Sequence, residues 1–162
     1  MKKILFRLST FLLLTLFIAC SSDDDNNSST LTVNGQSVKF FSVEGEYDPE
    51  GSFDYFTFWI NDITSTSNSI YMQATIPYTV KLVSGVDITN DCSILMQWDG
   101  GSEYIMGDYR SGKLTIENFD TKNKIATLKF DNYKCVSNLR NETILNGTLI
   151  IPYKVIEYGS AK

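Results

Sequence analysis

Residues 70–78 read IYMQATIPY, and this stretch decides the fold class. Apolar or aromatic side chains occupy every second position: Ile70, Met72, Ala74, Ile76 and Tyr78. The positions between them include Tyr71, Gln73 and Thr75, which carry polar groups. Alternation with a period of two is the pattern of a β-strand that buries one face. The stretch therefore predicts a strand whose even-numbered side chains point into a core.

The same period recurs on both sides of this stretch. It is found in residues 55–60, where both faces are apolar or aromatic, and in residues 94–98. It is found again in residues 145–153, where Pro152 has no N–H for a ladder. A proline in a strand is confined to edges, ends and bulges, so the strand is expected to end at Pro152 or lie at an edge there.

Turn signals separate these segments. Asn34-Gly35 suits the tight type I′ hairpin turn. Residues 118–123, NFDTKN, predict the reversal of a hairpin that spans residues 113–131, because Asp and Asn tolerate turn geometry and bond their own backbone. Short strands separated by such turns indicate an all-β domain.

No stretch after residue 31 shows a sustained apolar period of 3.6 residues. We expect one domain over residues 31–162, an antiparallel two-sheet β-sandwich of about eight or nine strands. The alternative is a closed β-barrel. The choice matters because a barrel can hold a ligand inside and a filled sandwich cannot.

Residues 1–19 have the features of a secretory signal peptide. Lys2, Lys3 and Arg7 precede an uncharged run from Leu8 to Ala19. A run of about a dozen residues is shorter than the roughly 20 that a membrane-spanning helix needs. A cleaved signal is therefore predicted in place of a retained anchor helix.

Residues 16–20, LFIAC, resemble the lipobox of bacterial lipoproteins. The resemblance implies cleavage before Cys20, a thioether-linked diacylglycerol on its sulfur and an acyl chain on its freed amine. One acyl chain binds a membrane marginally, whereas several anchor a protein stably. The expected membrane partner is therefore reached through lipid on Cys20.

The segment that follows, residues 20–30, is predicted to be a lipidated cysteine and a disordered polar tether. Residues 21–30 read SSDDDNNSST and contain no apolar side chain to bury. The opening serines and aspartates, residues 21–25, resemble the export signal of Bacteroidetes-type surface lipoproteins. That resemblance implies the outer face of the outer membrane; the alternative is its periplasmic face.

Charge and composition exclude several classes of function. The formal charge is −5 and the chain has no histidine. Loss of residues 1–19 removes three positive charges and no negative one, which brings −5 to −8. The basic footprint of a nucleic-acid-binding protein is absent. The lack of histidine removes the commonest general base and the commonest metal ligand.

The chain has three cysteines, and lipid on Cys20 leaves Cys92 and Cys135. An even pair in an oxidising compartment suggests a disulfide, which would stabilise the fold by roughly 4 kcal/mol in the chain-entropy model. The alternative is two separate buried thiols that act as small hydrophobic side chains.

No catalytic or cofactor-binding motif is present, so we expect a non-enzymatic protein without a cofactor. The enzyme class that stays open is a carboxylate-based glycosidase. Its candidate acids are Asp48, Glu50, Asp54, Asp99 and Glu103. Three of these, Asp48, Glu50 and Asp54, could also offer oxygen ligands to calcium, but their spacing fits no known loop motif. We expect a plain acidic loop and no metal site.

Aromatic residues crowd one strand, residues 53–59. Only alternate positions of a strand can face one core. If the face of Tyr55 and Trp59 is exposed, it forms a patch suited to stacking on sugars or docking a protein; otherwise packing covers both faces. Two hypotheses follow: an accessory module that binds a surface protein or glycan, and a carrier whose barrel interior holds a small apolar molecule.

The mature region resembles a family of small Bacteroidetes-type surface lipoproteins of undetermined function. The features that carry the resemblance are Asn34-Gly35, the hairpin through residues 118–124 and the closing run LNGTL at residues 145–149. The resemblance implies a β-rich fold and no established activity.

Overall fold

The structure is a computed structural model that describes residues 28–38, 42–50, 54–61, 70–98, 104–106, 111–136 and 142–157. These residues form strands, turns and loops, and no helix occurs among them. The described residues therefore contain no helix that is long and apolar enough to cross a membrane. The prediction of an all-β domain is confirmed.

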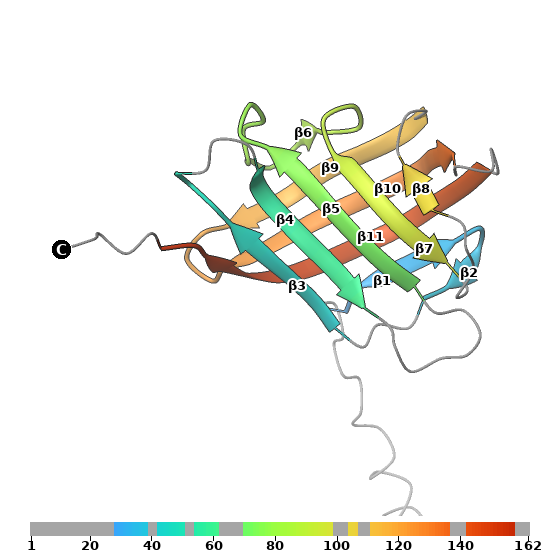
Figure 1. Ribbon diagram of the computed structural model, residues 1–162, viewed down its shortest axis with the longest axis horizontal. Coiled ribbons are helices and arrows are strands. Elements are labelled where there is room, and N and C mark those ends of the chain that lie inside the picture. The colour runs from blue at the N-terminus through green and yellow to red at the C-terminus, as the bar shows by residue number, and fades with distance from the viewer. Residues whose placement is uncertain are drawn as a thin grey trace, which may run out of the picture.

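The strands lie in one curled sheet. They are β1 (Thr30–Val33), β2 (Gln36–Ser37), β3 (Ser42–Tyr47), β4 (Asp54–Asn61), β5 (Ile70–Pro77), β6 (Val86–Asp87), β7 (Ser93–Trp98), β8 (Tyr104–Met106), β9 (Ser111–Asp120), β10 (Ile125–Val136) and β11 (Glu142–Val155). Their order is β6-β9-β10-β11-β3-β4-β5-β7-β8, and β1 pairs with β11 and β2. Figure 1 shows β3, β4, β5 and β7 in front of β9, β10 and β11.

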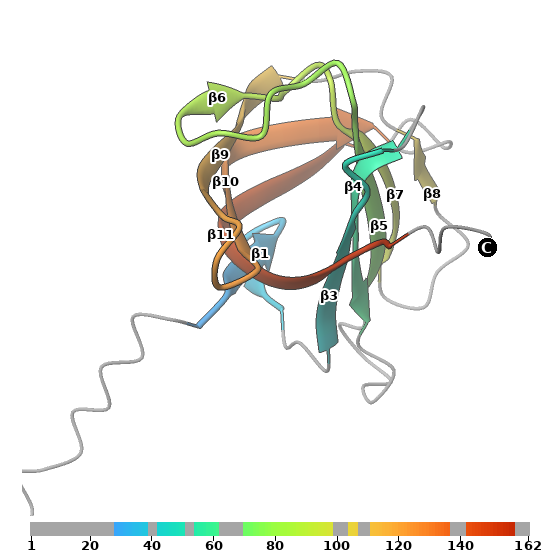
Figure 2. The same cartoon turned by 90° about the vertical axis from the view of Figure 1, so that its left-hand side faces the viewer.

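The sheet differs from the purely antiparallel one that was predicted. β11 and β3 run parallel, with Tyr153 opposite Gly45 and Val155 opposite Tyr47. The other ladders are antiparallel. Because β11 pairs with β1 through residues 145–148 and with β3 through residues 153–155, one long strand joins both halves. The result is an open half-barrel, seen end-on in Figure 2, and the two-sheet sandwich is not confirmed.

One cross-strand row through β1, β11 and β10 contains backbone irregularities that favour bending of the sheet. Gly147 of β11 (φ 120°) lies opposite both Leu31 and Phe130. Beside Phe130, the register of β10 shifts, and Asn132 at φ 45° donates its N–H to the side chain of Asn146 over 2.7 Å. Bulges and glycines bend a strand and increase its twist, so this row helps to curl the sheet.

Pro152 does not end its strand, since β11 continues to Val155. The N–H of Tyr153 donates to Lys124 beside β10, so the ring nitrogen of Pro152 faces the other edge. On that edge, β1 pairs up to Thr148 and β3 pairs from Tyr153. Pro152 therefore lies in the gap between two partner strands, where no N–H is needed.

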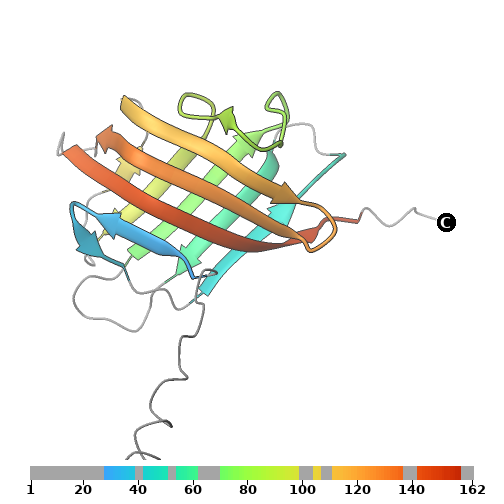
Figure 3. The same ribbon diagram turned by 180° about the vertical axis from the view of Figure 1, so that it is seen from behind.

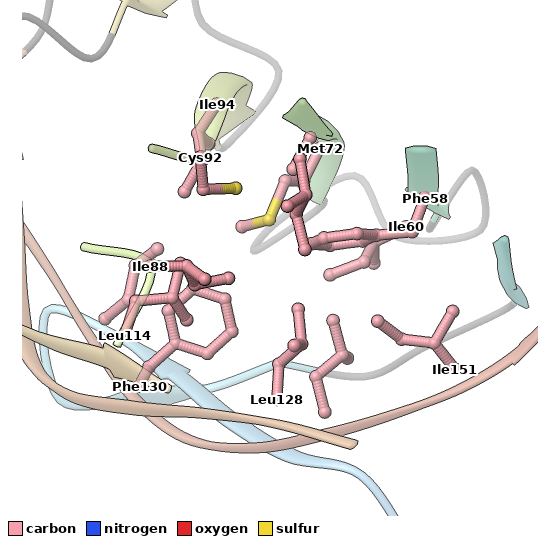
Figure 4. Close-up of a cluster of buried hydrophobic side chains, with 14 of the residues drawn as sticks. Phe58, Ile60, Met72, Ile88, Cys92, Ile94, Leu114, Leu128, Phe130 and Ile151 are labelled. Atoms are coloured by element: carbon pink, nitrogen blue, oxygen red, sulfur yellow. The ribbon is translucent and has the colours of Figure 1, made fainter. Parts of the chain in front are cut away.

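Side chains from both halves fill the space between them. β5 buries Ile70, Met72, Ala74 and Ile76, as the opening stretch predicted; Tyr78 follows the end of β5 and is 57% exposed. Figure 4 shows Phe58 and Met72 from one half facing Phe130 and Leu114 from the other. These side chains are fully buried, or nearly so. The core therefore lies inside the curl, and the opposite face of β3, β4, β5 and β7 is left to solvent.

Candidate functional site

The solvent side of β3, β4, β5 and β7 presents ordered cross-strand rows of side chains. We call it the outer face, and its residues are Glu44, Glu46, Thr57, Trp59, Asn61, Tyr71, Gln73, Thr75, Leu95 and Gln97. Each of these side chains is exposed or half-buried. The alternate residues of the same strands point into the core, as Phe56, Phe58 and Ile60 do in β4. The face exists because the strands alternate sides with a period of two.

Two rows of the outer face combine rings with amides. In the first row, Trp59 lies opposite Glu44 on one side and Gln73 on the other, and Gln73 lies opposite Leu95. In the second row, Asn61 lies opposite Tyr71. Trp59 and Tyr71 are thus diagonal neighbours, a relation that places Cβ atoms about 7–8 Å apart or slightly less.

A groove of about 340 Å³ opens at one end of the first row. Its lining residues are Glu44, Gly45 and Glu46 of β3, Trp59 of β4, and Pro152, Tyr153 and Lys154 of β11. The volume lies at the lower end of the roughly 300–1,000 Å³ of small-molecule sites. The groove therefore has room for a compact group placed against the Trp59 side chain.

The close approach of β11 to β3 shapes the floor of this groove. A Cβ on Gly45 would lie 2.9 Å from the Ile151 side chain and 3.1 Å from that of Phe56. Glycine is therefore the residue that lets β3 pass this close to β11. The two strands pair over three residues only, and their outward side chains form the walls.

The groove carries more negative than positive charge. Glu44, Glu46 and Lys154 are exposed, and among the described residues Lys154 forms no salt bridge with either carboxylate. Carboxylates accept hydrogen bonds, and the ammonium group donates them. The arrangement can therefore hold a group that is rich in both donors and acceptors.

The structure separates the two aromatic residues that the sequence placed together. Trp59 is half-buried and lines the groove. At Tyr55 the register between β4 and β5 shifts, and its ring packs edge-on against Tyr47 with centroids 5.1 Å apart. The two hydroxyl oxygens are 3.0 Å apart. Tyr55 thus packs against the core, and Trp59 has Tyr71 as its aromatic neighbour on the outer face.

An aromatic cluster lies on the inner side of the same junction. Its members are Tyr47, Tyr55, Phe56, Phe119 and Tyr153. Phe119 stacks on Tyr153 with centroids 5.0 Å apart. Burial, and then its hydrogen bond to Tyr55, raises the pKa of Tyr47 to about 12. Burial, and then the nearby Asp120 carboxylate, raises the pKa of Tyr153. The cluster is a packed support for β3 and β11 beneath the groove.

Of the predicted positions whose side chains are described, Asp48, Glu50, Cys92 and Cys135 are not among the residues that line this groove. Asp48 is buried, and its carboxylate accepts the N–H of Glu50 over 3.1 Å, as in an Asx turn. Among the described side chains, no cluster of three or more potential ligands could hold a metal. Asp54 lies in β4, where only its backbone is described; Asp99 and Glu103 lie outside the described residues.

Cys92 and Cys135 are both fully buried in the core. The Sγ atom of Cys92 lies 3.8 Å from the Ser93 carbonyl, and that of Cys135 lies 3.7 Å from the Thr143 carbonyl. The disulfide stays a prediction that mass spectrometry of non-reduced peptides can test. Cys20 lies outside the described residues.

Comparison with known proteins adds no relative: no family model, no curated protein and no solved structure matches this chain. Sequence reasoning missed Glu44, Tyr71 and Gln73 of the outer face, and Lys154 of the groove. Tyr71 and Gln73 were available as the outward positions of residues 70–78. The contribution of β11 could not be predicted, because the parallel pairing that brings Lys154 to β3 leaves no local signal in the sequence.

Proposed function

We propose that this protein is a lipid-anchored module at the outer membrane, without catalytic activity, and that its outer face binds a partner. One observation carries the proposal: Trp59 and Tyr71 lie as diagonal neighbours on a solvent-facing sheet, beside a groove. Tyr71 is 39% exposed, and the adjacent row ends in Leu95 at 38%. Contiguous apolar surface that has a polar rim and is open to solvent is typical of an interaction site.

The place of β1, where the predicted tether joins the domain, supports a binding role for the outer face. β1 is the first strand after the predicted tether. Just before β1, the hydroxyl of Ser29 accepts a hydrogen bond from the N–H of Ile150 in β11. Figure 3 shows β1 beside β11, on the side of the molecule away from β3, β4, β5 and β7. An anchor at Cys20 would thus leave the outer face open to the surroundings.

The alternative is a carrier that holds a small apolar molecule between the two halves. Large side chains occupy that space, including Phe56, Phe58, Phe130 and Tyr133, all with 2% exposure or less. A close-packed interior leaves little room for a ligand. The packing therefore favours a binding module that uses its surface.

Crosslinking on intact cells tests the proposal. The tagged full chain would be compared with Trp59→Ala/Tyr71→Ala, with Cys20→Ala and with Tyr78→Ala. Tyr78 is a matched control because it is more exposed than Tyr71 and lies beyond the outer face. We expect the wild type and Tyr78→Ala to recover the same partner, and the double variant and Cys20→Ala to lose it.

Equal recovery by the double variant would remove the outer face from the proposal. Equal recovery by Cys20→Ala would show that anchoring plays no part in binding. Thermal melts of all variants would show that they fold, which is expected because Trp59 and Tyr71 are not fully buried.

A further inference from the structure

The side chains of the outer face match the chemistry of sugars. A pyranose ring has a face of C–H groups that stacks on an aromatic ring, and a rim of hydroxyls that donate and accept hydrogen bonds. Trp59 and Tyr71 offer the rings, and such side chains combine a large apolar surface with a polar end. Asn61 and Gln73 stand opposite them, and each amide offers both donors and an acceptor.

The spacing of the rows suits a chain of sugars rather than a single ring. The row from Glu44 through Trp59 and Gln73 to Leu95 crosses four neighbouring strands. Neighbouring strands are about 4.7–4.9 Å apart, a step close to the length that one pyranose ring adds to an extended glycan. Trp59 and Tyr71, as diagonal neighbours with Cβ atoms about 7–8 Å apart or slightly less, can therefore support separate rings of one chain.

Charge narrows the class of glycan. Glu44 and Glu46 are exposed at the groove, where Lys154 is the only cation among the lining residues. The formal charge of the whole chain is −5. Repulsion between like charges opposes a polyanionic chain, whereas the carboxylates can accept hydrogen bonds from the hydroxyls of an uncharged one.

We infer that the outer face binds a chain of a neutral polysaccharide that runs across β3, β4, β5 and β7. Trp59 and Tyr71 are the stacking platforms, and the groove beside Trp59 holds one ring of the chain against Glu44 and Glu46. This inference rests on the proposed binding function and names its ligand class.

Affinity electrophoresis tests the inference with protein extracted in detergent from cells that express the full chain. The gels would contain β-glucan, xyloglucan, galactomannan, starch or dextran as neutral probes, and polygalacturonate as the anionic probe. We expect at least one neutral polysaccharide to retard the protein and polygalacturonate to leave its mobility unchanged. Trp59→Ala and Tyr71→Ala should each weaken retardation about tenfold, which corresponds to about 1.4 kcal/mol. Tyr78→Ala should match the wild type.

Three results would overturn the inference: mobility unchanged by every neutral probe, retardation by polygalacturonate alone, or retardation that survives both substitutions. The first result, combined with a protein partner that the double variant loses on intact cells, would leave the binding module standing and reject its glycan ligand. If no neutral polysaccharide retards the protein and crosslinking on intact cells recovers no partner, the proposed function itself is rejected.

Discussion

At the residue scale, Gly147 is the glycine, of those that the structure describes, at which a side chain has least room. A Cβ built there would lie 1.5 Å from the Thr30 carbonyl oxygen, and the backbone φ is 120°. We expect Gly147→Ala to lower the free energy of unfolding by more than about 3 kcal/mol or to prevent folding, because backbone atoms of β1 must move.

Gly85→Ala is the control for this substitution. Gly85 also has a positive φ, 85°, but nothing lies within 4 Å of a Cβ there, so a cost of about 1 kcal/mol is expected from the backbone alone. Urea melts followed by circular dichroism measure both variants. Equal losses would show that the approach of β1 to Gly147 does not limit the fold.

Tyr47 predicts a stability change at high pH. Its pKa is raised from 10.0 to about 12, so the folded state holds this proton more tightly than the unfolded state. Between pH 10 and pH 12 the unfolded state therefore binds fewer protons, and stability falls as pH rises. The contribution is fully present below pH 10.

Tyr47→Phe should flatten this decline, as measured by urea melts across the window. Tyr55→Phe should have an intermediate effect, because it removes the hydrogen bond and leaves the burial, which is the larger cause. A full decline in Tyr47→Phe would assign the titration to another group, and Tyr153, whose pKa is also raised, would be examined next.

At the element scale, a short series of hydrogen bonds connects the loop after β6 to β9. The Asp87 carboxylate accepts the N–H and the hydroxyl of Thr89, over 3.0 and 2.5 Å. These two bonds, the hydroxyl one first, lower the pKa of Asp87. The Thr89 hydroxyl oxygen in turn accepts the buried N–H of Leu114 over 2.9 Å. Thr89 thus connects a loop to the core strand beside it.

Thr89→Val should lower stability by about 1–3 kcal/mol, because the N–H of Leu114 loses its buried acceptor. Thr89→Ser keeps the hydroxyl and should retain most of that stability. Hydrogen exchange at the Leu114 amide gives a local measurement of the same bond. Slow exchange in Thr89→Val would mean that another acceptor replaces the hydroxyl.

Elements were predictable where the signal is local. The period of residues 70–76 identified both the strand and its buried face. Asn34 and Gly35 have positive φ values of 51° and 79°, as their turn requires, and residues 113–131 form the predicted hairpin. The bulge at Tyr55 was not predictable, since a register shift depends on the partner strand and leaves no mark on the alternation.

At the scale of the whole molecule, the pairing of β11 with its neighbouring strands could not be predicted from the sequence. This strand pairs with β10, which precedes it in the chain, and also with β1 and β3, which lie about a hundred residues before it. Trp59 could be named from its strand alone. Its neighbours Pro152 and Lys154 come from the parallel ladder of β11 with β3. The candidate site is therefore a product of topology, and its aromatic residues are the part that local sequence reveals.

The predicted tether gives the last test, because its resemblance to an export signal predicts on which side of the outer membrane the domain stands. Residues 21–27, SSDDDNN, offer no apolar side chain to pack, and a polar, unpacked segment is a preferred site of proteolytic cleavage. We expect a broad-specificity protease added to intact cells to release the domain into the medium, with a soluble periplasmic protein left uncut as the control. Replacement of Asp23, Asp24 and Asp25 by alanine removes the residues that resemble the export signal and keeps Cys20, so the variant should stay anchored but become protected. A wild-type domain that is protected in intact cells and cut in broken ones would place it at the periplasmic face, where its outer face could meet only ligands that have already crossed the outer membrane.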